Sequence, residues 1–221
     1  QGACDISAGA VKALYNFKER KPRVPDAALL SDTLAAVGHR YIHLSGDTVF
    51  LSKKGMRIGF GAIGKGYAAD KVRSIWKSQG VRAGVINASG DLTAWGLQPD
   101  GNPWRVGIAD PRDPSRILLW LPVDDAAVAT SGNYEQYFEI DGVRYSHNID
   151  PRTGIPVRGI KSVTIISPSA ELSDALATAV TVMGATAGLH LIDQLPEVHG
   201  IIIDEKDHLL SSKNITTHAH N

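Results

Sequence analysis

The chain has 221 residues, and its 23 Lys and Arg residues balance 23 Asp and Glu residues. That length suits one domain with a sizeable core, and the balanced charge does not favour a nucleic-acid surface, which needs a clustered basic excess. The single cysteine, Cys4, excludes an internal disulfide and a cysteine zinc site, and no apolar run is long enough for a transmembrane helix.

The first part of the chain reads as helices followed by strands. We expect helices over 7–17 and 26–38, and a hairpin over 41–51. A strand starting at Met56 is expected to run through glycines into a helix that ends near Gly80.

The glycines between Met56 and the following helix suggest two nucleotide-binding motifs, but the sequence lacks a required residue of each. Three of them have dinucleotide-fold spacing, but residues 71–90 contain no acid for a ribose. Gly59 with Gly64-Lys65 has P-loop spacing, but Gly66 stands where a P-loop needs Ser or Thr. The start of a helix still offers free N–H groups, and Lys65 adds a charge for a phosphate. Alternatively, these glycines serve packing only.

The second part predicts mainly antiparallel strands. They are expected over 81–87, 92–95, 104–108, 116–123 and 126–130, with small-residue turns at 88–91 and 130–134. A helix from Ser173 to Gly184, a second helix through Leu195 and a hairpin over 200–210 follow. The fold class is therefore α+β, with mixed, largely antiparallel sheets and packed helices. We expect one domain over 1–221, with a small lobe around 90–145 as the alternative.

Asp174 and Thr178 form the first candidate site. They are four residues apart in an Ala- and Leu-rich segment, so in a helix both oxygens lie on one face. Two oxygens at this spacing suit Mg²⁺, which takes few protein carboxylates and completes its shell with waters and phosphates. The alternative is that Asp174 is a first-turn carboxylate favoured by the helix dipole, with Ser173 as the cap.

A rigid loop around Pro151 and Gly154 forms the second candidate site, because Pro fixes φ and Gly allows positive φ. His147 just before it could act as a general base near neutral pH, or could be a half-buried strand histidine with a satisfied hydrogen bond. Arg152 either orients phosphate or holds Asp150 in a salt bridge, and we favour the salt bridge.

Together these segments predict phosphoryl or nucleotidyl chemistry on a bulky phosphorylated ligand. The polar residues they share are Lys65, Asp91, Ser131, His147, Asp150, Arg152, Asp174 and Thr178.

Five motifs occur in a fixed order, at 61–70, 87–91, 130–134, 147–156 and 174–178, after an initial Gly2-Ala3-Cys4-Asp5-Ile6-Ser7. Their order and composition resemble the ApbE family of FAD:protein FMN transferases, whose first motif is Gly-x-Phe-Asp-x-Thr. The resemblance implies an Mg²⁺-dependent enzyme that moves FMN from FAD to a Ser or Thr hydroxyl of a target flavoprotein, through a phosphoester, and releases AMP. The alternatives are an FAD pyrophosphatase giving FMN and AMP, and a non-catalytic FAD-binding protein.

The resemblance also implies roles for single residues. Asp174, Thr178 and the backbone oxygen of Ala62 would bind the metal, and His147 would help deprotonate the acceptor hydroxyl. The residues expected to bind FAD are Gly61, Lys65, Gly66, Asp70, Gly90, Asp91, Thr130, Ser131, Gly132 and Asp150.

The resemblance further implies where the protein works. We expect a short form that lacks the usual N-terminal region and acts on the periplasmic side of the bacterial inner membrane. Its partners would be FAD and the acceptor flavoprotein, without nucleic acid. It would meet a membrane, if at all, only through a lipid anchor or the acceptor.

Overall fold

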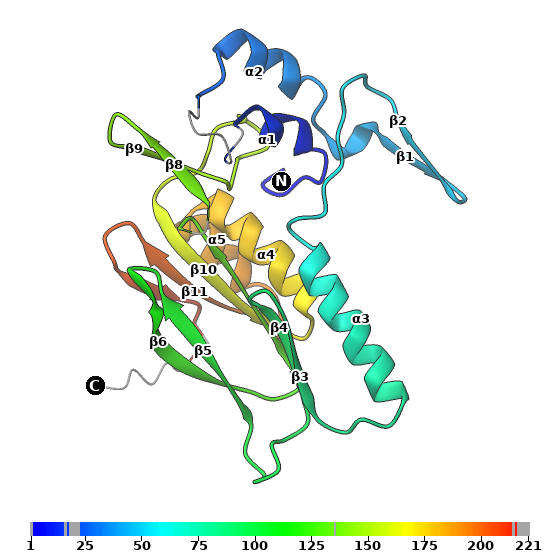
Figure 1. The fold of residues 1–221 in the computed structure, drawn as a ribbon, viewed down its shortest axis with the longest axis vertical. Coiled ribbons are helices and arrows are strands. Elements are labelled where there is room, and N and C mark those ends of the chain that lie inside the picture. The colour runs from blue at the N-terminus through cyan, green and yellow to red at the C-terminus, as the bar shows by residue number, and fades with distance from the viewer. Residues whose placement is uncertain (1, 16, 18–22, 135, 214, 216–221) are drawn as a thin grey trace.

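The structure, a computed structural model, describes residues 2–15, 17, 23–134, 136–213 and 215. Its centre is a six-stranded antiparallel sheet with the strand order β12-β11-β10-β7-β4-β3 (Figure 1). The strands are β3 (Gly84–Ala88), β4 (Asp91–Trp95), β7 (Ala127–Gly132), β10 (Ile160–Ser167), β11 (His199–Asp204) and β12 (Leu209–Ser211). Helices pack beside this sheet, so the predicted α+β class is confirmed.

Different elements cover the two faces of the sheet, because successive side chains of a strand point to opposite sides. Leu92 and Ala94 of β4 pack into a core with the hairpin formed by β5 (Trp104–Asp110) and β6 (Asp113–Val123). Thr93, between them, faces the other side, where its hydroxyl accepts a hydrogen bond from Arg73 of α3 (Gly64–Ser78) at 3.1 Å. The sheet therefore separates a hairpin layer from a helix layer.

Aliphatic side chains hold α4 (Ala170–Met183) and α5 (Ala185–Ile192) in the helix layer. Val163 and Ile165 of β10 are fully buried in one cluster with Ala177 and Val180 of α4. Burial of a Val or Ile side chain contributes about 1.5–3 kcal/mol to the free energy of unfolding, and the smaller alanine contributes less. This packing fixes the part of α4 that carries Asp174 and Thr178.

A smaller layer lies above the sheet in Figure 1 and contains α1 (Gly9–Tyr15), α2 (Ala27–Leu34) and the hairpin of β8 (Tyr137–Ile140) and β9 (Val143–Ser146). Val11 and Tyr15 of α1 are fully buried in a cluster with Phe138 of β8. The Tyr15 hydroxyl donates to the Gly154 carbonyl oxygen at 2.7 Å, so α1 is tied to the loop after β9. A 3₁₀ turn (His39–Tyr41) leads to a hairpin of β1 (Ile42–Ser45) and β2 (Thr48–Leu51), which projects from the molecule (Figure 1).

The helices predicted near the N-terminus are present but shorter. The first spans Gly9–Tyr15 rather than 7–17. The second begins after Asp26, whose carboxylate accepts from the Leu29 amide at 2.9 Å, and it ends at Leu34 instead of reaching residue 38.

The strand predicted from Met56 is wrong. In the described structure this segment makes only an isolated bridge between Arg57 and Ala8. The Gly59 amide donates to the Ile6 carbonyl of the N-terminal segment at 2.8 Å, and the backbone then turns into α3, where the Gly64 amide donates to the Phe60 carbonyl at 2.7 Å. The glycines thus shape a turn before the helix.

The turn predicted at 130–134 is also partly wrong. Residues Thr130–Gly132 continue β7 because they pair with 162–164 of β10. The helix expected to reach Leu195 ends at Ile192, and the hairpin of β8 and β9 was not among the predicted elements. The closing hairpin at 200–210 is confirmed as β11 and β12.

The longest helix of the described chain, α3, has 15 residues, and none of the described helices is long and apolar enough to cross a membrane. The β5–β6 hairpin shares one hydrophobic core with strands of the main sheet. The division of the chain into one domain, with or without a small lobe, stays a prediction.

Candidate active site

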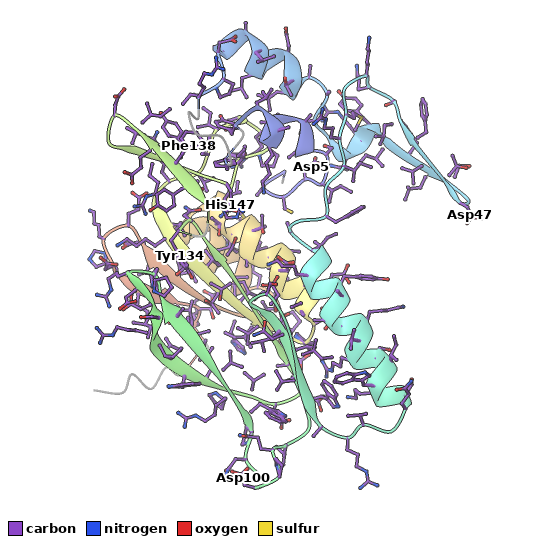
Figure 2. All side chains as sticks on the ribbon, viewed as in Figure 1. Asp5, Asp47, Asp100, Tyr134, Phe138 and His147 are labelled. Carbon is purple, nitrogen blue, oxygen red and sulfur yellow. The ribbon has the colours of Figure 1, made fainter. Side chains whose placement is uncertain are left out.

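A cavity of about 220 Å³ lies where the N-terminal segment, the start of α3, β7, α4 and the loop after β9 meet. Figure 2 shows His147 in this region, between Asp5 of the N-terminal segment and Tyr134 beyond β7. Segments far apart in the sequence thus surround one space. The predicted site residues that line it are Gly61, Ala62, Lys65, Thr130, Ser131, His147, Asp174 and Thr178.

Asp174 reaches the cavity from the second turn of α4. The helix begins at Ala170, and its cap is Ser169, whose hydroxyl accepts from the Leu172 amide at 3.2 Å. The alternative of a first-turn Asp174 capped by Ser173 is therefore wrong. Asp174 is only 5% exposed, and its Oδ2 accepts weakly from the Gly66 amide at 3.4 Å. Thr178 follows one turn later and lines the same cavity.

A second carboxylate lies beside Asp174. Asp91 opens β4 and is 1% exposed, and its Oδ2 lies 2.5 Å from the Lys65 ammonium of α3. Burial and the charge of Asp91 raise the pKa of Asp174 to about 7, although Lys65 opposes the shift. Burial beside Asp91 disfavours the ionised form of Asp174, and a bound cation would offset that cost.

The residues present fit Mg²⁺ better than a transition metal. The Asp174 carboxylate, the Thr178 hydroxyl and the Ala62 carbonyl supply only oxygen, which magnesium prefers. The described residues contain no group of three or more His, Cys, Asp or Glu side chains that could hold a metal by themselves. A cation here would complete its shell with water or substrate phosphate.

His147 follows β9 and is half-buried. Its Nδ1 lies 3.2 Å from the Gln136 carbonyl oxygen, which can only accept, so Nδ1 carries the hydrogen and Nε2 keeps a free lone pair. Burial, with the positive charges of Lys12 and Lys65, lowers the pKa of His147 to about 4 despite the bond to Gln136. The imidazole is therefore neutral at pH 7 and can accept a proton through Nε2.

The loop after His147 is held by its own polar groups. Arg152 donates to both carboxylate oxygens of Asp150, at 2.8 and 2.7 Å, so the favoured structural reading of Arg152 is confirmed. Gly154 has a φ of +71°, as predicted from its place in the turn. Pro151, between Asp150 and Arg152, lines the cavity.

Comparison with known proteins decides the family. A model of the ApbE family matches residues 1–202. The chain belongs to the ApbE family. It is 35% identical over 202 residues to the FAD:protein FMN transferase of Vibrio cholerae and 35% identical over 219 residues to that of Treponema pallidum. These matches cover 89% and 91% of the chain but 60% of each relative, so the chain spans about 60% of their length.

Solved ApbE structures have the same fold. The ApbE protein of Thermotoga maritima superposes with a TM-score of 0.87 at 35% identity, covering 96% of this chain and 70% of that one. The apo form of the flavinyl transferase ApbE of Pseudomonas stutzeri gives 0.85 at 33% identity, covering 96% and 67%.

Some residues predicted from the ApbE resemblance do not line the cavity. Asp70 accepts from the Ala170 and Glu171 amides at 3.0 and 2.9 Å, so it caps α4. Gly66 packs against the backbone of Ala170, and Gly90 turns the chain between β3 and β4. Asp91, Gly132 and Asp150 also lie outside the lining. Cofactor binding by these six residues stays a prediction.

Sequence reasoning missed several lining residues. Asp5, Gly9 and Lys12 come from the N-terminal segment, and Asn148 comes from the loop after β9. Asp5 organises this segment by accepting from the Ser7 hydroxyl at 2.6 Å and the His39 amide at 3.0 Å. The match of this segment to the ApbE Gly-x-Phe-Asp-x-Thr motif was the signal that could have placed it at the site.

Proposed function

We propose that this chain is an Mg²⁺-dependent FAD:protein FMN transferase that forms a phosphoester with a Ser or Thr hydroxyl and releases AMP. The observation that carries the proposal is the meeting of His147, Asp174 and Lys65 in one cavity. The names of the relatives support it, since the curated proteins at 35% identity are FAD:protein FMN transferases.

The reaction needs a base and charge compensation. The acceptor oxygen forms a bond to the phosphorus of the FMN half, the bond from that phosphorus to the bridging oxygen breaks, and AMP leaves with that oxygen. His147 would take the hydroxyl proton at Nε2, because Nδ1 is occupied by the Gln136 carbonyl. A neutral imidazole at pH 7 is ready for this step.

The cation would be held by Asp174, Thr178 and Ala62, and it would offset the charge of the diphosphate. Lys65 brings a further positive charge to the same cavity, while its ion pair with Asp91 fixes its position. At about 220 Å³ the cavity is smaller than the usual ligand pocket of about 300–1,000 Å³. It would therefore hold the diphosphate region, while the rest of FAD lies outside it.

The deciding experiment is mass spectrometry of a candidate acceptor flavoprotein incubated with this protein, FAD and Mg²⁺. The proposal expects the mass of one FMN phosphoester on a Ser or Thr of the acceptor, AMP in solution, and loss of both with EDTA. Free FMN and AMP without labelled acceptor would instead identify an FAD pyrophosphatase. Bound but intact FAD would identify a flavin-binding protein, and either result would overturn the transferase.

We also propose that the protein acts on the periplasmic side of the bacterial inner membrane, meeting the membrane only through a lipid anchor or its acceptor. The support is the family resemblance of the sequence. Fractionation of the native bacterium with a protease-accessibility assay tests it: the protein should be degraded in spheroplasts without detergent. Protection until the inner membrane is opened would contradict the proposal.

A further inference from the structure

Two lysines line the cavity, and their surroundings differ. Lys65 forms an ion pair with Asp91 at 2.5 Å. Lys12, on α1, has no carboxylate within ion-pair distance in the described part of the chain. The two carboxylates of the lining are not paired with Lys12: Asp5 accepts hydrogen bonds from Ser7 and the His39 amide, and Asp174 lies beside Asp91. Lys12 thus brings to the cavity a positive charge with which no described carboxylate forms an ion pair.

The backbone that carries Lys12 is firmly placed. Its neighbour Val11 and the nearby Tyr15 are fully buried, and the Tyr15 hydroxyl bonds to the Gly154 carbonyl of the loop that follows His147. Lys12 itself counts among the exposed residues, yet partial burial of its ammonium lowers its pKa. A lysine normally extends its charged ammonium into solvent. Lys12 instead lines the cavity, where its positive charge suits an anionic ligand.

The positive charge of Lys12 also affects the pKa of His147. After burial, Lys12 is the largest cause of the lowered pKa of His147, ahead of Lys65. The Lys12 ammonium therefore lies close enough to influence the ring that we assign as the base. An anion placed between these groups would interact with both.

We propose that Lys12 binds the diphosphate of FAD from the α1 wall, as a second cation besides Lys65, and stabilises the negative charge that passes to AMP. The inference rests on the proposed function and extends it. When the bond between the FMN phosphorus and the bridging oxygen breaks, that oxygen leaves with AMP and takes the bonding electrons. Lys12 stays protonated and offsets this charge, while the acceptor proton goes to His147.

The test compares Lys12→Met, which keeps the aliphatic stem, with Lys12→Arg, which keeps the charge. Lys71→Met is the matched control, since Lys71 is an exposed lysine of α3 outside the cavity lining. FAD affinity is measured by flavin fluorescence in Mg²⁺, at low and high salt. Lys12→Met should weaken FAD binding about tenfold or more, as expected for a lost charge-assisted hydrogen bond, and should reduce the salt dependence. Lys12→Arg should retain most of the affinity.

A pH profile supplies a readout that simple loss of packing would not move. Removing the Lys12 charge raises the pKa of His147, so the acid limb of kcat/KM for transfer should shift to higher pH in Lys12→Met. It should not shift in Lys71→Met or Lys12→Arg.

The outcomes are separable. If the wild type binds FAD and transfers FMN, and Lys12→Met matches Lys71→Met in affinity, salt dependence and pH profile, the inference about Lys12 is wrong and the proposed function stands. Equal losses in Lys12→Met and Lys12→Arg would also overturn it, because the charge would then not matter. If the wild type binds no FAD, the proposed function fails and the inference falls with it.

Discussion

Asp174 lies where its own charge is unfavourable, because it is buried next to Asp91. Without metal, the change Asp174→Asn should therefore raise the Tm at pH 8, where the wild-type carboxylate is ionised. The same variant should lose about 100-fold or more of Mg²⁺-dependent transfer, since a neutral amide is a poor ligand for magnesium. Scanning calorimetry with EDTA or Mg²⁺, together with the mass-spectrometric assay, measures both effects.

The control for this variant is Glu171→Gln, which removes a negative charge from an exposed position on the same helix. It should change neither the Tm nor the transfer rate appreciably. Mg²⁺ should raise the Tm of the wild type and of Glu171→Gln, but not that of Asp174→Asn. An equal Mg²⁺ effect in all three proteins would exclude Asp174 as a ligand.

His147 is neutral at pH 7 and presents Nε2 as an acceptor, so its removal should affect chemistry more than binding. We expect His147→Gln to slow transfer by about 100- to 10,000-fold, the usual range for a general base, while the Kd for FAD changes little. Single-turnover rates and fluorescence titrations separate the two quantities. Similar losses in both would show that the ring supports the loop rather than the reaction.

At the residue scale, the sequence could predict pairs whose geometry is local. The four-residue spacing of Asp174 and Thr178 is enough to place both on one helical face. The neighbours of Asp174 could not be predicted from the sequence, because Asp91 comes close to it only through the packing of β4 beneath α3 and α4. Lys12 was missed for the same reason, since nothing local shows that α1 borders the cavity.

At the scale of elements, the site depends on how closely α3 approaches α4. Gly66 makes this approach possible, because a Cβ at that position would clash with the Ala170 carbonyl group. We expect Gly66→Ala to cost about 1–3 kcal/mol of unfolding free energy, as overpacking does, and to reduce FAD binding by displacing Lys65. Urea denaturation and fluorescence titration provide the measurements.

Gly64→Ala is the matched control on the same helix. Its Cβ would meet only the Phe60 Cβ at 3.6 Å, an ordinary contact, and alanine favours helix over glycine. This variant should be as stable as the wild type or more stable. If Gly66→Ala behaved likewise, the contact between α3 and α4 would be looser than the structure indicates.

Elements with strong local patterns were predictable, and elements decided by pairing were not. The hairpins at 41–51 and 200–210 agree with their turn signals. Thr130–Gly132 looked like a turn because of its small polar residues, but pairing with β10 extends the strand. The glycines after Met56 looked like a strand leading into a helix, but their backbone bonds form a turn.

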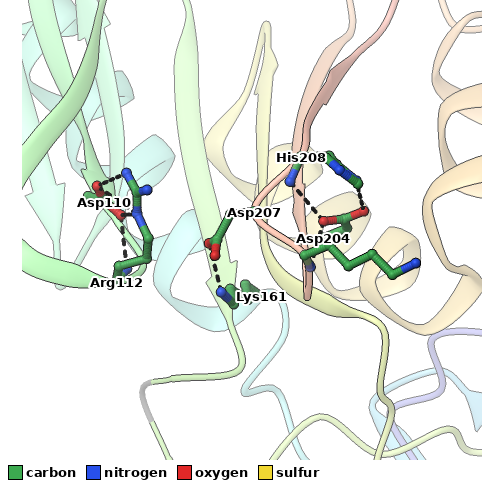
Figure 3. Close-up of polar contacts among 7 residues, drawn as sticks. Asp110, Arg112, Lys161, Asp204, Asp207 and His208 are labelled. Atoms are coloured by element: carbon green, nitrogen blue, oxygen red, sulfur yellow. Dashed lines mark hydrogen bonds and ion pairs between the residues drawn. The ribbon is translucent and has the colours of Figure 1, made fainter.

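At the scale of the whole molecule, several carboxylates outside the cavity lining form ion pairs. Figure 3 shows Asp110 with Arg112, Asp207 with Lys161, and Asp204 with His208. Hydrogen bonds from Arg112, at 2.6 to 3.2 Å, lower the pKa of Asp110 to about 2. A lowered carboxyl pKa contributes stability that is present above the unfolded value of about 3.9 and is lost as the pH falls through the folded value. We expect the Tm to fall steeply below about pH 4.

Between about pH 4 and 6.5 two groups in the site act in opposite directions. His147 has a folded pKa of about 4, below its unfolded value of about 6.5, so the unfolded chain binds more protons and stability from this group rises with pH. Asp174 has a folded pKa of about 7, above its unfolded value of about 3.9, so stability from this group falls as the pH rises. In metal-free protein, the opposite changes of stability with pH that come from His147 and Asp174 should largely cancel.

Single variants should therefore show a change of Tm with pH that is cancelled in the wild type. With EDTA present, the Tm of the wild type should change little from pH 4.5 to 6.5, that of Asp174→Asn should rise with pH, and that of His147→Gln should fall. The double variant should again be nearly flat, because both groups are gone. Slopes of the same sign in the two single variants would contradict the assigned pKa directions, whereas opposite slopes would show that the cavity lowers the pKa of His147 and raises that of Asp174.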